Sequence, residues 1–255
     1  MDQPMTPTAP TQQPMLLGQL FRAAWSTFVK HWKTIVLLTL IVSLPLNLLS
    51  AITSAQIGPN TGDPQQFLNG IKGVFGAGLG ITVLLASLAG ILIPLGIVAI
   101  VRAGDNNQTL DIQTAFGQAA SRWGAGLVTS LIMVVLLIGL ALLLVVPAII
   151  FGVFWAFAIF AVMHDNLQGM AALKESKRVV QGHWWKVFGN VIAFGFVAGI
   201  AGSILSAPFY ALPVGVIQTT VTSTITSVTS SFALVAGYLL YRSLKAATPA
   251  PPNAK

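Results

Sequence analysis

Four long stretches without a charged residue constrain this chain more than any other feature of its sequence. They cover residues 34–62, 73–101, 123–164 and 187–241. A membrane-crossing helix needs about 20 apolar residues, and a charge at its centre is costly. Only 7 % of the residues are charged, against about 25 % in a soluble domain. We therefore expect an all-α, polytopic integral membrane protein rather than a soluble enzyme, a disordered chain or a disulfide-rich secreted domain.

Six membrane-spanning helices are predicted when prolines and loop residues divide these stretches. As one helix the run 123–164 would be about 63 Å long, twice the hydrocarbon thickness, so we expect Pro147 to turn it back. The segment 207–213 contains two prolines and divides the last run in the same way. The predicted spans are 34–53, 79–101, 125–146, 148–164, 187–206 and 218–241.

The basic residues predict the orientation of these spans, because cytoplasmic loops are enriched in Lys and Arg. With the N-terminus inside, only Lys72 lies in a predicted outer loop. The inner segments carry Arg22, Lys30, Lys33, Arg102, Arg122, Lys174, Lys177, Arg178, Lys186, Arg242, Lys245 and Lys255. We expect both termini in the cytoplasm, with disordered tails at 1–13 and 246–255. The net charge of +7 then favours anionic inner-leaflet lipids as partners rather than nucleic acid.

An amphipathic segment that ends at a tryptophan precedes each odd-numbered span. The first is an interfacial helix predicted over 14–33, and similar segments end at Trp123 and Trp184. The pattern predicts an interfacial helix followed by a hairpin of two spans, repeated three times within a membrane domain over 34–245. The alternative is that these segments are only the cytoplasmic ends of long helices. The candidate interfacial anchors are Trp25, Trp32, Lys33, Trp123, Trp184, Trp185 and Lys186.

The segment 172–196, ALKESKRVVQGHWWKVFGNVIAFGF, resembles the signature of a group of bacterial six-span membrane proteins. The matching residues are Ala172, Leu173, Ser176, Gly182, Trp185, Lys186 and Phe188. The group contains the membrane domain of glycerophosphoryl diester phosphodiesterase and related uncharacterised families. The resemblance implies a module in the cytoplasmic (inner) membrane of a bacterium. It does not imply phosphodiesterase activity, since that activity belongs to a separate soluble barrel for which this chain has no room.

Few residues in this sequence are candidates for a catalytic role. No ionisable residue lies near the middle of a predicted span, where functional groups of membrane proteins are usually found. The sequence also lacks cysteine and the HExxH, GxSxG and Walker-type motifs. We therefore expect no catalytic residue, no cofactor and no metal. An intramembrane enzyme remains an alternative, and it would have to use His164, Asp165 and Glu175 at the inner interface.

The last predicted span is rich in hydroxyl groups, since residues 219–231 read TTVTSTITSVTSS. The apolar stripe that we expect to face lipid consists of Val221, Ile225, Val228, Phe232, Val235 and Leu239. The candidate polar inward face consists of Thr222, Ser223, Thr226, Ser227 and Ser230. These hydroxyls either bond carbonyls of their own helix and allow close packing, or line a polar cavity.

Small and polar residues predict further helix contacts. The pairs Gly76/Gly80, Gly195/Gly199 and Ala198/Gly202 are spaced for close helix packing, within the chain or in a homodimer. Asn47 follows Pro45 in the first predicted span, and we expect its side chain to bond the carbonyl that the proline frees.

Two functions fit these features. The first, which demands least of the residues present, is a non-enzymatic membrane module. It would bind lipid or a membrane protein partner at the cytoplasmic leaflet. The second is a carrier or channel for a small polar or amphiphilic solute, lined by the hydroxyl face of the last span.

Overall fold

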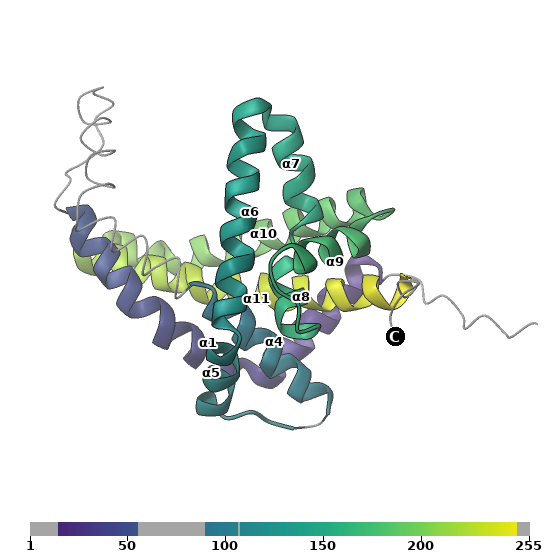
Figure 1. Cartoon of the computed structure of the whole chain (residues 1–255). Coiled ribbons are helices and arrows are strands. Elements are labelled where there is room, and N and C mark those ends of the chain that lie inside the picture. The colour runs from purple at the N-terminus through teal and green to yellow at the C-terminus, as the bar shows by residue number, and fades with distance from the viewer. Residues whose placement is uncertain (1–14, 56–89, 107, 249–255) are drawn as a thin grey trace, which may run out of the picture.

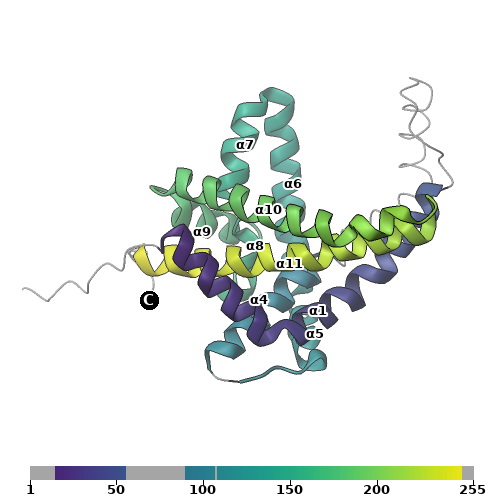
Figure 2. The same ribbon diagram turned by 180° about the vertical axis from the view of Figure 1, so that it is seen from behind.

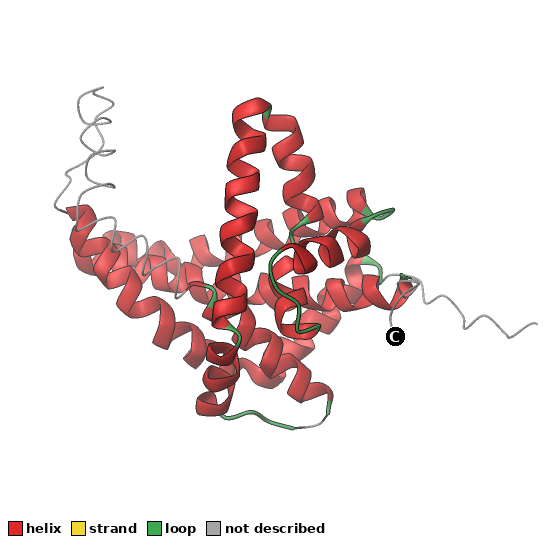
Figure 3. Ribbon diagram, viewed as in Figure 1, coloured by secondary structure: helices red, strands yellow, loops and turns green. Residues whose placement is uncertain are grey.

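The computed structural model describes residues 15–55, 90–106 and 108–248, and most of these are helical (Figures 1 and 3). The elements are α1 (Leu17–Ala55), α4 (Leu92–Asp105), α5 (Ile112–Ser121), α6 (Trp123–Leu143), α7 (Val145–Phe154), α8 (Ala158–His164), α9 (Met170–Val180), α10 (Trp184–Ser206), η1 (Ala207–Ala211) and α11 (Val216–Ala247). These residues form no strand. The all-α prediction is therefore confirmed for the described part of the chain.

Within the described residues, five helical stretches are long and apolar enough to cross a membrane. They are Leu17–Ile52, Trp123–Leu143, Val145–His164, Trp184–Ala211 and Val216–Ala247. These stretches contain or largely overlap the first and the last four predicted spans. The predicted second span, 79–101, lies only partly within the described residues, where its C-terminal part contributes to α4. The tail predicted at 1–13 and residues 249–255 of the tail predicted at 246–255 lie outside the described residues. The C-terminal tail begins later than predicted, because α11 continues through Ala247. Several long apolar helices agree with a multi-pass membrane protein.

Three long helices form one layer, in which α11 packs against both α1 and α10 (Figure 2). Phe232 of α11 lies where they meet. Its ring centroid is 5.6 Å from that of Phe21 in α1 and 6.1 Å from that of Phe194 in α10. The hairpin of α6 and α7 runs across the direction of α10 and α11 and projects away from this layer (Figures 1 and 2).

The chain bends immediately before a tryptophan at three places. Inside α1 the helical backbone is interrupted at His31 (φ −115°, ψ 16°), just before Trp32. The same conformation occurs at Arg122 (φ −106°, ψ 1°) before Trp123, and at His183 (φ −124°, ψ 19°) before α10. Figure 2 shows the two halves of α1 running in different directions. The first of the three segments therefore runs in a different direction from the helix that follows it, and the other two are separated from α6 and α10 by a break in the helical backbone.

The fourth predicted span differs from the expected single helix. The chain turns at Leu144, whose backbone is extended (φ −160°, ψ 134°), so the prediction that Pro147 makes the turn is wrong. Pro147 lies in the first turn of α7, where its missing N–H leaves no helical bond unmade. A second interruption separates α7 from α8 at residues 155–157. The predicted span 148–164 is thus two short helices.

Candidate functional site

A polar pocket of about 270 Å³ lies between the end of α4, the loop after it and α5. Its polar side chains are Arg102, Asn106, Gln108 and Gln118. The Arg102 Nη1 donates a hydrogen bond of 2.9 Å to the carbonyl oxygen of Met163, which ties α4 to the end of α8. Among the described residues Arg102 has no carboxylate partner. Its remaining N–H donors can therefore serve an anion.

The first two bends lie beside this polar pocket. The imidazole of His31 packs so closely against Gly104 that a side chain at that position would collide with it. The Thr34 Oγ1 donates to the carbonyl of Leu110, which also lines the pocket, at 3.4 Å. Gln118 precedes the bend at Arg122 by about one helical turn. Residues that line the pocket therefore lie next to the bends at His31 and at Arg122.

A second polar group joins α9 and the end of α8 to α11. We name it the Asp165 cluster, and it contains Asp165, Glu175, Arg178, Tyr241 and Lys245. The Asp165 carboxylate accepts hydrogen bonds from the Tyr241 hydroxyl and the Lys245 ammonium. Glu175 accepts a bond of 2.7 Å from Arg178 Nη2 and lies 3.6 Å from Lys245 Nζ. The bond from Arg178 lowers the pKa of the Glu175 carboxyl.

The three residues of the enzymatic alternative have separate partners. The Nδ1 atom of His164 lies 2.9 Å from the Tyr238 hydroxyl. Asp165 and Glu175 are both held by cations, as described above. The lowered pKa of Glu175 makes that carboxyl a poor general acid, and the Asp165 carboxylate is occupied by the bonds from Tyr241 and Lys245. We interpret the Asp165 cluster as a joint between helices.

The predicted interfacial anchors differ in exposure. Trp25, Trp32 and Trp185 are 57 %, 50 % and 78 % exposed, and Lys33 is also exposed. Trp123, Trp184 and Lys186 are half-buried. The Trp184 indole N–H donates to the carbonyl of Ile150 in α7 at 3.2 Å. Trp184 is therefore also a packing residue.

The residues that carry the family resemblance have a common structural role around α9. Ala172, Leu173 and Ser176 are buried, and Leu173 packs against Trp155 and Ala158 at the helix interruption. The Ser176 hydroxyl donates to the carbonyl of Phe154 at 2.7 Å and accepts from the Phe157 N–H at 3.1 Å. It thereby satisfies two backbone groups that the interruption leaves free.

The other matching residues shape the turn from α9 into α10. Gly182 has φ +85°, a conformation that other residues rarely adopt. The ring of Phe188 stacks on Trp184, with centroids 5.0 Å apart. The turn and the stacked rings connect α9 to α10.

The hydroxyl face of α11 mainly bonds its own helix and α1. Thr222, Thr226 and Ser227 donate to the carbonyls four residues earlier at 2.9 Å. Ser231 Oγ lies 2.8 Å from Thr39 Oγ1 of α1. Of the predicted inward face, Thr222, Ser223 and Ser227 are half-buried, whereas Thr226 and Ser230 are exposed.

The apolar stripe of α11 is only partly placed as expected. Phe232, Val235 and Leu239 are buried between helices, so the prediction that they face lipid is wrong. The N-terminal half of the stripe is half-buried. The reason is that α11 is covered by different neighbours along its length, including α4 and α9 near its C-terminal end.

The predicted small-residue contacts and the role of Asn47 are also modified. Gly202 packs against α11, where an added Cβ would lie 2.9 Å from Thr229 Oγ1, while Gly195 and Gly199 face open space. Gly76 and Gly80 lie outside the described residues. The Asn47 amide does not bond the carbonyl freed by Pro45, and donates to Thr224 Oγ1 at 3.2 Å and more weakly to Ser227.

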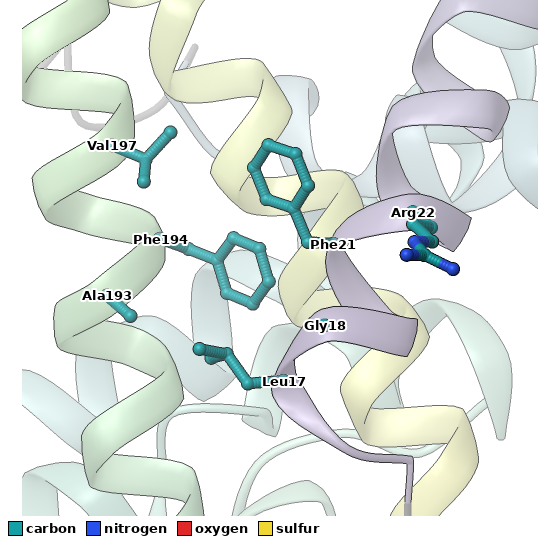
Figure 4. Close-up of a pocket in the computed structure, with 7 residues that line it drawn as sticks. All are labelled: Leu17, Gly18, Phe21, Arg22, Ala193, Phe194 and Val197. Carbon is teal, nitrogen blue, oxygen red and sulfur yellow. The ribbon is translucent and has the colours of Figure 1, made fainter.

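An apolar groove of about 410 Å³ lies between the first half of α1 and α10 (Figure 4). The rings of Phe21 and Phe194 stack along it with centroids 6.4 Å apart. Figure 4 shows the side chain of Arg22 pointing away from these rings. Arg22 therefore borders the groove without turning its guanidinium toward the rings, whereas Arg102 is one of the polar side chains of the polar pocket.

Comparison with family models, with curated proteins and with solved structures gives no match to this chain. The family resemblance stays a prediction. The sequence reasoning missed the polar pocket and the role of Tyr241. One signal was visible, since Arg102 is the charge that ends the second apolar run, followed closely by the amides of Asn106 and Gln108.

Proposed function

We propose that this protein is a non-enzymatic module of a bacterial cytoplasmic membrane that binds anionic lipid at the inner leaflet. Both termini lie in the cytoplasm, and the three amphipathic segments lie along the cytoplasmic surface of the membrane. The observation that carries the proposal is the polar pocket around Arg102. It combines an arginine that has no carboxylate partner in the described part of the chain with three amide side chains.

A lipid phosphate suits this pocket chemically. A guanidinium donates to phosphate oxygens through several N–H groups, and side-chain amides donate to the same oxygens. A cavity of about 270 Å³ is just below the usual range for small-molecule sites, so it has room for a headgroup and not for the acyl chains. The chains would extend along the apolar surfaces of the neighbouring helices.

The two remaining functions have weaker support. A carrier lined by the hydroxyl face of α11 needs free hydroxyl groups, and several of these hydroxyls donate to carbonyls of α11. A membrane protein partner or a homodimer would need a surface with defined complementarity, and no contact of the described residues points to one. Lipid binding therefore remains the function that we propose.

The test is a titration of the purified protein with phosphatidylglycerol and, separately, with phosphatidylcholine. Native mass spectrometry measures how much of each lipid is bound. We expect the anionic lipid to bind more tightly. The substitution Arg102→Gln removes bonds to a charged group worth about 1.5–3 kcal/mol, which weakens phosphatidylglycerol binding about 10- to 100-fold.

Arg22→Gln is the matched control, because it removes the same charge from a side chain that points away from the apolar groove (Figure 4). We expect it to leave the affinity nearly unchanged. Equal binding of the two lipids by the wild type would contradict the proposed function. Equal losses in the two variants would mean that general charge, not the polar pocket, attracts the lipid.

A further inference from the structure

The turn between α6 and α7 is entirely apolar. Between Leu131 and Met163 the chain has no charged residue, no amide, no hydroxyl and no histidine. Residues 142–146 form the tip of the hairpin, and each of them is between 65 % and 83 % exposed. A hairpin that crosses a membrane places its turn in water or among headgroups, where polar groups and Trp or Tyr are usual. This tip has none of them.

The base of the hairpin is held next to interfacial residues. Lys177 of α9 lies over the rings of Phe151 and Phe154 in α7, with Nζ 5.7 Å and 5.9 Å from their centroids. The Trp184 indole bonds the carbonyl of Ile150. In membrane proteins lysine ammonium groups are usually placed in the headgroup region, and tryptophan is enriched in the same region. Residues 150–154 therefore lie near the membrane surface.

The distance from this level to the tip is short. From Phe154 to Leu144 a helix rises about 15 Å at 1.5 Å per residue. On α6, Thr129 Oγ1 accepts a bond of 2.8 Å from the N–H of Gly169, just before α9. From Thr129 to Leu144 the rise is about 22 Å. Both values are smaller than the hydrocarbon thickness of about 30 Å.

The direction of the hairpin agrees with this limit. The α6–α7 hairpin runs across α10 and α11 (Figures 1 and 2). If α10 and α11 cross the membrane, a hairpin that is inclined to them covers less depth than its own length, so the rises of about 15 Å and about 22 Å are upper limits on the depth of its tip. In this arrangement α7 brings the chain back to the cytoplasmic side. It ends there at the interruption before α8, where the Ser176 hydroxyl bonds the Phe154 carbonyl and the Phe157 N–H.

We propose that the α6–α7 hairpin enters and leaves the membrane from the cytoplasmic side, with its tip among the acyl chains. The chain then has four spans and one re-entrant hairpin in place of six spans. Both termini keep the same side, because a re-entrant hairpin and a pair of spans return the chain to the same surface. The tip is helical on both sides of the extended residue Leu144, whose own N–H bonds the Leu140 carbonyl at 2.8 Å, so few of its backbone groups are left for the hydrocarbon to meet.

Cysteine accessibility tests this topology, and the chain contains no cysteine of its own. We would compare Leu144→Cys with Val214→Cys, which lies in the α10–α11 turn and is 92 % exposed. Each variant is treated with a membrane-impermeant maleimide in right-side-out and in inside-out vesicles. Labelling after denaturation shows that each thiol is present and reactive.

We expect L144C to react at least about tenfold more slowly in both vesicle types than after denaturation, because the thiol lies where there is no water. V214C should react rapidly from the outside. Rapid reaction of L144C from either side would overturn the proposal. Disulfide-linked dimers of L144C after oxidation would also overturn it, since a second copy rather than acyl chains would then cover the tip.

Discussion

Two helical hairpins in this protein both lie in long stretches without a charged residue, yet they differ in their polar side chains and in their surroundings. The α10–α11 hairpin packs along its length and against α1, with hydroxyl and amide bonds between α1 and α11. Its turn contains two prolines, Tyr210 and Gly215, and Gln218 follows closely. The α6–α7 hairpin projects from the molecule, and its turn is aliphatic. The comparison teaches that hydropathy marks both hairpins as candidate membrane helices, while the polarity of their turns is what separates them in the topology that we propose.

The largest difference in stability should appear when a lysine is placed in one turn or in the other. In the proposed topology Leu144→Lys puts an ammonium in hydrocarbon, which costs about 2.5–3.5 kcal/mol on insertion scales. Val214→Lys should have little effect, since the same topology places that turn at the outer surface. The free energy of unfolding in bicelles measures both. Equal effects of the two lysines would remove the distinction between the hairpins.

The base of the α6–α7 hairpin should depend on Ser176. Ser176→Ala leaves the Phe157 N–H and the Phe154 carbonyl without their partner, and an unsatisfied buried group costs about 1–3 kcal/mol. Ser203→Ala is the control, because Ser203 is exposed on α10. Chemical unfolding in detergent gives both values. If Ser176→Ala costs no more than the control, the interruption does not depend on α9.

The packing of the α10–α11 hairpin should be sensitive at Gly202 and insensitive at Gly199. A Cβ at Gly202 lies 2.9 Å from Thr229 Oγ1, whereas one at Gly199 meets nothing within 4 Å. Gly202→Ala should lower the free energy of unfolding by about 1 kcal/mol, the low end for overpacking. Gly199→Ala should leave it unchanged or slightly raised. A reversed order would show that α10 presents a different face to α11.

The smallest effect concerns the Glu175–Arg178 pair on α9, beside the base of the α6–α7 hairpin. The folded pKa of Glu175 is lowered from its ordinary value of 4.5 by the bond from Arg178. The stabilisation is therefore complete above this ordinary value and is lost as pH falls through the lower folded pKa. Near pH 7 the free energy of unfolding of the wild type should exceed that of Glu175→Gln by at most about 1 kcal/mol.

That gain should shrink as the pH falls below the ordinary pKa of the carboxyl. Unfolding curves of the two proteins, measured across pH 3–7, give the difference. A gap that does not change with pH would exclude Glu175 as its source.

Much of this architecture follows from the sequence, because apolar runs and the basic residues beside them are local signals. The three Trp-marked segments were also predictable, and each of their bends lies just before the tryptophan. The interruption between α7 and α8 was not, since no proline lies there and the compensating Ser176 comes from another helix. The Asp165 cluster was equally hidden, because Tyr241 and Lys245 are far from Asp165 in sequence.

The depth of the two turns in a reconstituted bilayer tests the central comparison most directly. Spin labels at L144C and V214C would be compared by their collision rates with dissolved oxygen and with a water-soluble nickel complex. We predict high oxygen and low nickel accessibility for the label at residue 144, and the reverse for the label at residue 214. High nickel accessibility at both positions would show that both turns lie in water and would contradict the account.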